Sequence, residues 1–124
     1  MNIYKTFLTD SLSYADKNQY ISEMMNSHIW KSNNNATFSD IIEILGDIYD
    51  AAHISVKGIA VKADLSSRYL SERFGIPYST MENWITESSI CPLYVKLMLQ
   101  ECLGLYNASD TIYKLMHALC LDIQ

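Results

Sequence analysis

The chain has 124 residues, of which 49% are apolar and 19% charged, which suits a single domain with a hydrophobic core and a short appendage. Its net charge of −5 disfavours a generally basic nucleic-acid-binding surface. No apolar run reaches the roughly 18 residues of a transmembrane helix, and the first ten residues lack the charged-then-apolar order of a signal peptide. We therefore expect a cytoplasmic protein with no membrane partner.

The N-terminal part of the chain shows two short helical patterns. Apolar residues recur at helical spacing over residues 2–13 and again over residues 15–29. The asparagine-rich stretch 31–36 that follows is the clearest loop of the sequence. These patterns predict a helical hairpin that forms an N-terminal extension over residues 1–36.

A longer amphipathic helix is predicted over residues 38–54. Thr37 is a plausible N-cap, with Asp40 three residues later as its capping-box partner. One side of this helix is acidic and carries Asp40, Glu43, Asp47 and Asp50. That side is either a solvated surface or a docking surface for a basic partner.

Further helical patterns follow to the end of the chain. Ser55 can cap a helix over residues 55–64, Pro92 can open one that ends at Gly104, and a last helix is expected over about 109–122. The helix that begins at Pro92 has a broad apolar face, made of Tyr94, Val95, Leu97, Met98, Cys102 and Leu103. Strand-like alternation is weak throughout, so the fold class is all-α.

The stretch SSRYLSERFGIPYSTMENWI, residues 66–85, reads as a helix, a three-residue turn and a second helix. Leu70 and Phe74 share one face of the first helix, and Met81 and Trp84 share one face of the second. Gly75 stands where the first helix must end and the backbone needs a positive φ. A helix-turn-helix of this kind places its second helix in a DNA major groove.

The run RYLSERFGIPYSTMENW, followed by CPLYVKLML, resembles the XRE/Cro-like (phage-repressor type) helix-turn-helix family, in a subgroup common in Firmicutes mobile elements. Ser71 stands at the small-residue position, Gly75 at the turn and Met81 and Trp84 at the buried positions. The resemblance implies a five-helix lambda-repressor-like helix-turn-helix domain within residues 37–124, preceded by the N-terminal helical hairpin. It also implies a repressor-like transcriptional regulator of a phage or mobile element that binds double-stranded DNA as a homodimer. The N-terminal helices or the last helix would supply the dimer contact.

The candidate DNA-binding residues are those that the buried stripe leaves on the outside. The second helix of the motif would present Tyr78, Ser79, Glu82, Asn83 and Thr86 to base edges. Phosphate contacts would come from Arg68, Thr80 and Lys57.

Charge supports a different interpretation as well. Residues 1–52 carry three lysines and seven acids, whereas residues 53–106 carry five cations and five acids. The loop 86–90 contains Glu87 and no cation, although relatives often carry Arg or Lys there. The alternative is an acidic helix-turn-helix-derived inhibitor, such as an anti-CRISPR protein, whose acidic N-terminal half binds a nuclease effector in place of phosphates.

No grouping of residues indicates catalysis. The sequence has no Ser/His/Asp or Cys/His arrangement, no glycine-rich phosphate loop and no Cys/His ladder with metal-ligand spacing. We therefore expect neither an enzyme nor a metal site, and no cofactor.

Overall fold

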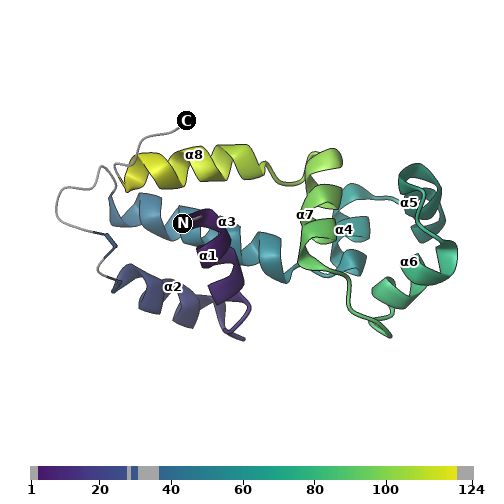
Figure 1. The fold of residues 1–124 in the computed structure, drawn as a ribbon, viewed down its shortest axis with the longest axis horizontal. Helices are drawn as coiled ribbons and strands as arrows, with labels where there is room; N and C mark the ends of the chain where they lie inside the picture. Colours follow the sequence, from purple (N-terminus) through teal and green to yellow (C-terminus); the bar gives the residue numbers. More distant parts are fainter. Residues whose placement is uncertain (1–2, 28, 31–36, 120–124) are drawn as a thin grey trace. The chain divides into compact units, whose positions relative to one another are not determined.

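The computed structural model describes residues 3–27, 29–30 and 37–119, and within them the chain forms eight α-helices and no strand (Figure 1). The all-α prediction is therefore confirmed. The helices are α1 Ile3–Ser11, α2 Lys17–Met25, α3 Phe38–His53, α4 Val56–Ala63, α5 Ser67–Phe74, α6 Tyr78–Ile85, α7 Leu93–Cys102 and α8 Ala108–Ala118. None of these described helices is long and apolar enough to cross a bilayer. The predicted loop 31–36, and residues 120–122 of the predicted last helix, lie outside the described residues.

Contacts between helices divide the chain into two compact units. The terminal unit comprises Met1–His53 and Asn107–Gln124, and the central unit comprises Ile54–Tyr106. The sequence predicted a division between residues 36 and 37 instead. The packing groups α3 and α8 with α1 and α2, because α3 buries apolar residues against all three of them.

The terminal unit is built around α3, along which α1, α2 and α8 pack (Figure 1). Ile41, Ile44, Leu45 and Ile48 recur at helical spacing on α3 and are almost fully buried. Buried hydroxyls add directed bonds to this apolar core: Tyr20 donates to the carbonyl of Phe7 at 2.9 Å. Such bonds select one arrangement of the helices, since an unpaired buried carbonyl is costly.

The start of α3 follows the predicted capping box. The amide of Asp40 donates to Thr37 Oγ1 at 3.2 Å, and the amide of Thr37 donates to Asp40 Oδ2 at 3.1 Å. Two amides that the helix itself leaves unpaired are satisfied in this way. The predicted cap of α4 is also confirmed, because Ser55 Oγ accepts from the amide of Gly58 at 2.9 Å.

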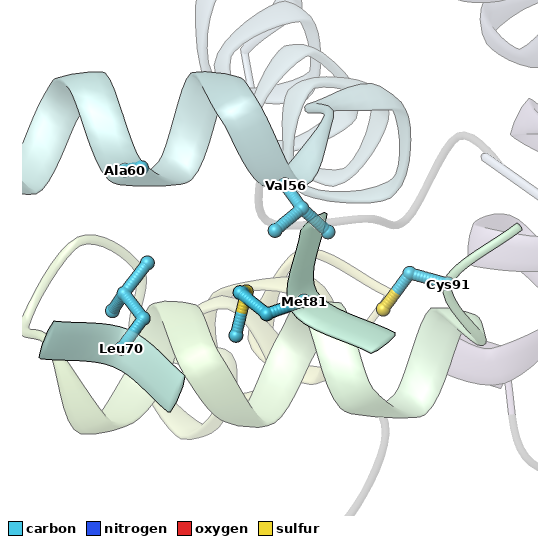
Figure 2. Packing of buried hydrophobic residues seen from close by; sticks show 5 residues of the cluster. All are labelled: Val56, Ala60, Leu70, Met81 and Cys91. Atoms are coloured by element: carbon cyan, nitrogen blue, oxygen red, sulfur yellow. The ribbon is translucent and has the colours of Figure 1, made fainter. Parts of the chain in front are cut away.

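The central unit folds around one small apolar cluster. Figure 2 shows its buried side chains, which come from α4, α5, α6 and the connection before α7: Val56, Ala60, Leu70, Met81 and Cys91. Half-buried residues surround this cluster, among them Phe74, Trp84 and Val95. Each helix of the predicted motif thus contributes one residue with no exposed surface to the centre of the unit: Leu70 from α5 and Met81 from α6.

The expected apolar face of α7 is only partly correct, because Val95 and Leu103 pack against the central cluster while three other residues do not. Tyr94, Met98 and Cys102 were placed on a broad apolar face, yet all three are exposed, Tyr94 by 68% and Met98 by 61%. The opposite side of α7 is the one that packs in the unit, where Leu99 is buried. Apolar residues surround much of this helix, so their spacing alone could not decide which side faces inward.

Candidate nucleic-acid interface

The turn between α5 and α6 is held by the backbone and by one serine. Gly75 has φ +65°, as predicted, and its amide donates to the carbonyl of Ser71. The Ser71 hydroxyl is buried and donates to the carbonyl of Ile76 at 2.6 Å. Because residue 71 is buried against the turn, a larger side chain there would displace the turn and break this hydrogen bond. The geometry of the turn therefore accounts for a small residue at this position.

The first turn of α6 presents backbone amides. Pro77 is the N-cap, and it offers no side-chain acceptor to the amides that follow. The helix dipole adds partial positive charge at the same end. Together these features make the N-terminus of α6 suitable for an anion.

The structure places most of the candidate DNA-binding residues on the surface of the central unit. Thr80 and Glu82 are half-buried, which limits how far they can reach. The remaining candidates are exposed: Tyr78, Ser79, Asn83 and Thr86 on α6 and its C-cap, Arg68 on α5, and Lys57 on α4.

Two of these residues are in direct contact. The guanidinium carbon of Arg68 lies 4.3 Å from the centroid of the Tyr78 ring. A cation over an aromatic face is attracted by the ring quadrupole. The first residue of α6 is thereby joined to the N-terminal turn of α5, and sequence spacing gave no signal of this pair.

The hydroxyl of Thr86 is already engaged. It donates to the carbonyl of Glu82 at 2.9 Å and lies 2.9 Å from Ser88 Oγ. A hydrogen bond from this hydroxyl to a base would have to replace one within the protein. Its methyl group is the part of Thr86 that remains for a contact with a thymine methyl.

The cations of the central unit fall into two groups. Lys96 is half-buried and donates to the carbonyl of Ile54 at 3.1 Å, and its burial lowers the pKa of its ammonium group. Arg73 lies over the Phe74 ring and donates to the carbonyl of Cys102. Lys57, Lys62 and Arg68 are exposed, and no ion pair to them is found among the described residues. Although the unit has no net charge, these three cations are available to phosphates.

Lys62 was not among the predicted contacts, although its charge and exposure match those of Lys57. Its position at the end of a helix was visible in the sequence, but nothing there ranked one outward lysine above the other.

Comparisons with protein-family models, with curated proteins and with solved structures find no match to this chain.

Proposed function

We propose that the central unit is a phage-repressor-type helix-turn-helix domain and that the protein is a repressor-like, sequence-specific DNA-binding regulator of a phage or mobile element. In this proposal α4 to α7 supply the core of a five-helix lambda-repressor-like arrangement. The observation that carries it is the two-sided character of α6. One side is held in the core through Met81, while its N-terminal turn projects Tyr78 and Ser79, with Arg68 beside them.

Base reading would come from the exposed side of α6. Asn83 can make a bidentate pair with adenine, and the aromatic ring of Tyr78 or the methyl of Thr86 can contact a thymine methyl. Glu82 was expected to accept from the N4 amino group of cytosine. Because Glu82 is half-buried, we rank it below Asn83 as a source of discrimination.

Phosphate contacts would hold α6 in register. The amides of the first turn of α6 would meet one phosphate together with Arg68, which lies against Tyr78, and Lys57 on α4 would meet another. Thr80 can add a hydroxyl, although it is half-buried. So few cations predict weak binding away from the specific site.

A homodimer would double this short interface, as two half-sites about 34 Å apart require. The sequence suggested the N-terminal helices or the last helix as the dimer contact. The exposed apolar residues Ile90, Tyr94 and Met98, spaced four apart along the segment that enters α7, favour that segment instead.

The test is fluorescence anisotropy with the full chain and a labelled duplex from upstream of its own gene. We expect tighter binding to this duplex than to a scrambled duplex of equal composition. For each tenfold rise in salt concentration, the binding constant should fall by about 0.9 log units per phosphate contact. Arg68→Ala should make the salt dependence less steep by about the contribution of one phosphate contact. Equal binding of both duplexes at low salt would refute the proposal.

Sequence preference is tested by one substitution and its control. Asn83→Ala should reduce the difference in affinity between the two duplexes, because a bidentate contact between a side chain and a base contributes about 1–3 kcal/mol of discrimination. Asn18→Ala makes the same change at an exposed position in the terminal unit and should leave the difference intact. If Asn83→Ala and Ser79→Ala together change nothing, the groove assignment of α6 is wrong.

A second candidate is the acidic protein inhibitor, in which the terminal unit occupies a cationic nucleic-acid channel of a nuclease effector. The distribution of charge favours it: the terminal unit carries four lysines and nine acids, so that it holds the whole net charge of −5. Inhibition of a nuclease by a protein that prefers no DNA sequence would select this candidate over the regulator.

A further inference from the structure

A cavity of about 260 Å³ lies between α3 and α8 in the terminal unit, whereas the residues of the proposed DNA contacts belong to the central unit. Its lining joins three kinds of side chain. Ile44 and Ala118 are buried and apolar, Tyr113 and His117 are aromatic, and Asp40, Glu43 and Lys114 are charged. The volume suits one side chain or a small fragment rather than a large ligand.

The aromatic wall is ordered. The rings of Tyr113 and His117, one helical turn apart on α8, are parallel within 5°, with their centroids 6.4 Å apart. Tyr113 is 58% exposed, so its ring is open to a partner. A planar cationic group stacks well on such a surface.

The charge at the cavity is unbalanced. Lys114 is paired with Asp110, which lies outside the lining, at 3.2 Å. Asp40 accepts the capping bond from Thr37 through Oδ2 alone. For the carboxylate of Glu43, no hydrogen bond or ion pair is found within the described part of the chain. The charge of Lys114 also acts on Glu43 and Asp47, so one lysine is shared among several acids at this cavity and leaves an excess of negative charge.

The surroundings add to this excess of negative charge. Burial and the nearby charge of Glu43 raise the pKa of Asp47, one turn further along α3. An added cation would relieve the repulsion between these carboxylates. Phosphate groups would be repelled, and no three His, Cys, Asp or Glu side chains of the described residues come together as a metal ion needs.

We propose that the α3–α8 cavity binds an arginine side chain from a basic segment of a partner protein. The guanidinium stacks on the Tyr113 ring while it donates to the carboxylate of Glu43, with Asp40 adding negative charge. The planar fork of arginine meets both requirements, whereas the ammonium of lysine meets the second alone. This site does not rest on DNA binding by the central unit, so either proposal can fail without the other.

The test is an NMR titration of the full chain with the peptide acetyl-Gly-Arg-Gly-Arg-Gly-amide, in which the resonances of Tyr113 and His117 are followed. We expect saturable shifts, and at least tenfold weaker binding of the same peptide with citrulline in place of arginine, because citrulline keeps the shape and loses the charge. A lysine peptide should bind severalfold more weakly than the arginine peptide. No saturable shift, or equal binding of the citrulline or lysine peptide, would overturn the proposal.

Variants of the protein test whether the peptide binds in the cavity, and a smaller ligand tests which part of the peptide is bound. Glu43→Gln and Tyr113→Ala should each weaken the arginine peptide at least threefold, whereas Glu72→Gln, the same change at an exposed position of α5, should not. Equal loss with Glu72→Gln would indicate binding to net charge alone and refute the cavity. N-acetyl-arginine amide keeps the guanidinium that makes the proposed contacts, so it should displace the peptide from the site, and failure to displace it would refute the assignment of the cavity to an arginine side chain.

Discussion

The two units of this chain differ in the interactions that stabilise their small cores and in their net charge. The central unit relies on one apolar cluster and a glycine turn, and its cations and acids balance. The terminal unit adds buried hydroxyl bonds between its helices and carries the whole net negative charge. The contrast suggests two surfaces with different partners: Arg68 beside the N-terminus of α6 in one unit, and carboxylates beside an aromatic wall in the other.

Met81→Ala should have the largest effect. Met81 has no exposed surface, and a large-to-small change at such a position costs about 2–5 kcal/mol of unfolding free energy. If the units are separately stabilised, hydrogen exchange will show lost protection of amides over residues 54–106 and retained protection in α3. Met98→Ala, at an exposed position of the same unit, should cost less than about 0.5 kcal/mol. Equal loss of protection in α3 would contradict the division into units.

Tyr20→Phe tests the polar bonds of the terminal unit. It leaves the carbonyl of Phe7 without the hydroxyl that now donates to it, which costs about 1–3 kcal/mol in a buried setting. Urea unfolding should show that loss, with α3 amides affected more than those of α6. Tyr113→Phe, at an exposed ring, serves as the control and should be neutral.

Gly75→Ala probes the turn through the backbone alone. A Cβ at this position would meet no atom within 4 Å, so the whole cost comes from φ +65°. We expect a loss of about 1–2 kcal/mol in thermal unfolding. Gly75→Asn should lose less, since asparagine tolerates the left-handed region better. Equal losses for the two variants would show that φ is not the cause.

Glu87→Gly should stabilise the central unit. Glu87 follows the α6 C-cap with φ +64°, a conformation that glycine adopts without strain. After the extra entropy of glycine in the unfolded chain is counted, the expected gain is at most about 1 kcal/mol. Loss of the acid should also tighten DNA binding at low salt, whereas Glu87→Gln should tighten binding without the gain in stability.

Asp47→Asn should have the smallest effect, and its sign depends on pH. Burial first, and then Glu43, raise the pKa of Asp47 in the folded protein, so ionisation of this carboxyl costs stability above the raised pKa and nothing below the unfolded one. The variant should therefore be more stable at pH 7, by less than about 0.5 kcal/mol at this exposed site, and unchanged near pH 2. Asp50→Asn loses the 2.9 Å ion pair with Lys17, so this variant should be less stable at pH 7.

Much of the local structure was predictable, because its causes lie close together in the chain. The capping pair of Thr37 and Asp40, the positive φ of Gly75 and the burial of Met81 each follow from spacing of a few residues. The pairing of Arg68 with Tyr78 and the exposure of Tyr94 did not follow. They depend on how helices pack across loops, which periodicity does not specify.

The same limit applies to the candidate surfaces. The outward positions of α6 could be read from the buried stripe, whereas the engaged hydroxyl of Thr86 could not. The acids of α3 were visible in the sequence, but their meeting with Tyr113 of α8 joins residues some 70 positions apart.

An NMR titration of the full chain with the upstream duplex tests the central claim most directly, because amides of both units report at once. We predict salt-sensitive shifts at Arg68, Tyr78, Ser79 and Asn83, with no change along α3 and α8. Shifts confined to the terminal unit, or the same shifts with a scrambled duplex of equal composition, would contradict that claim.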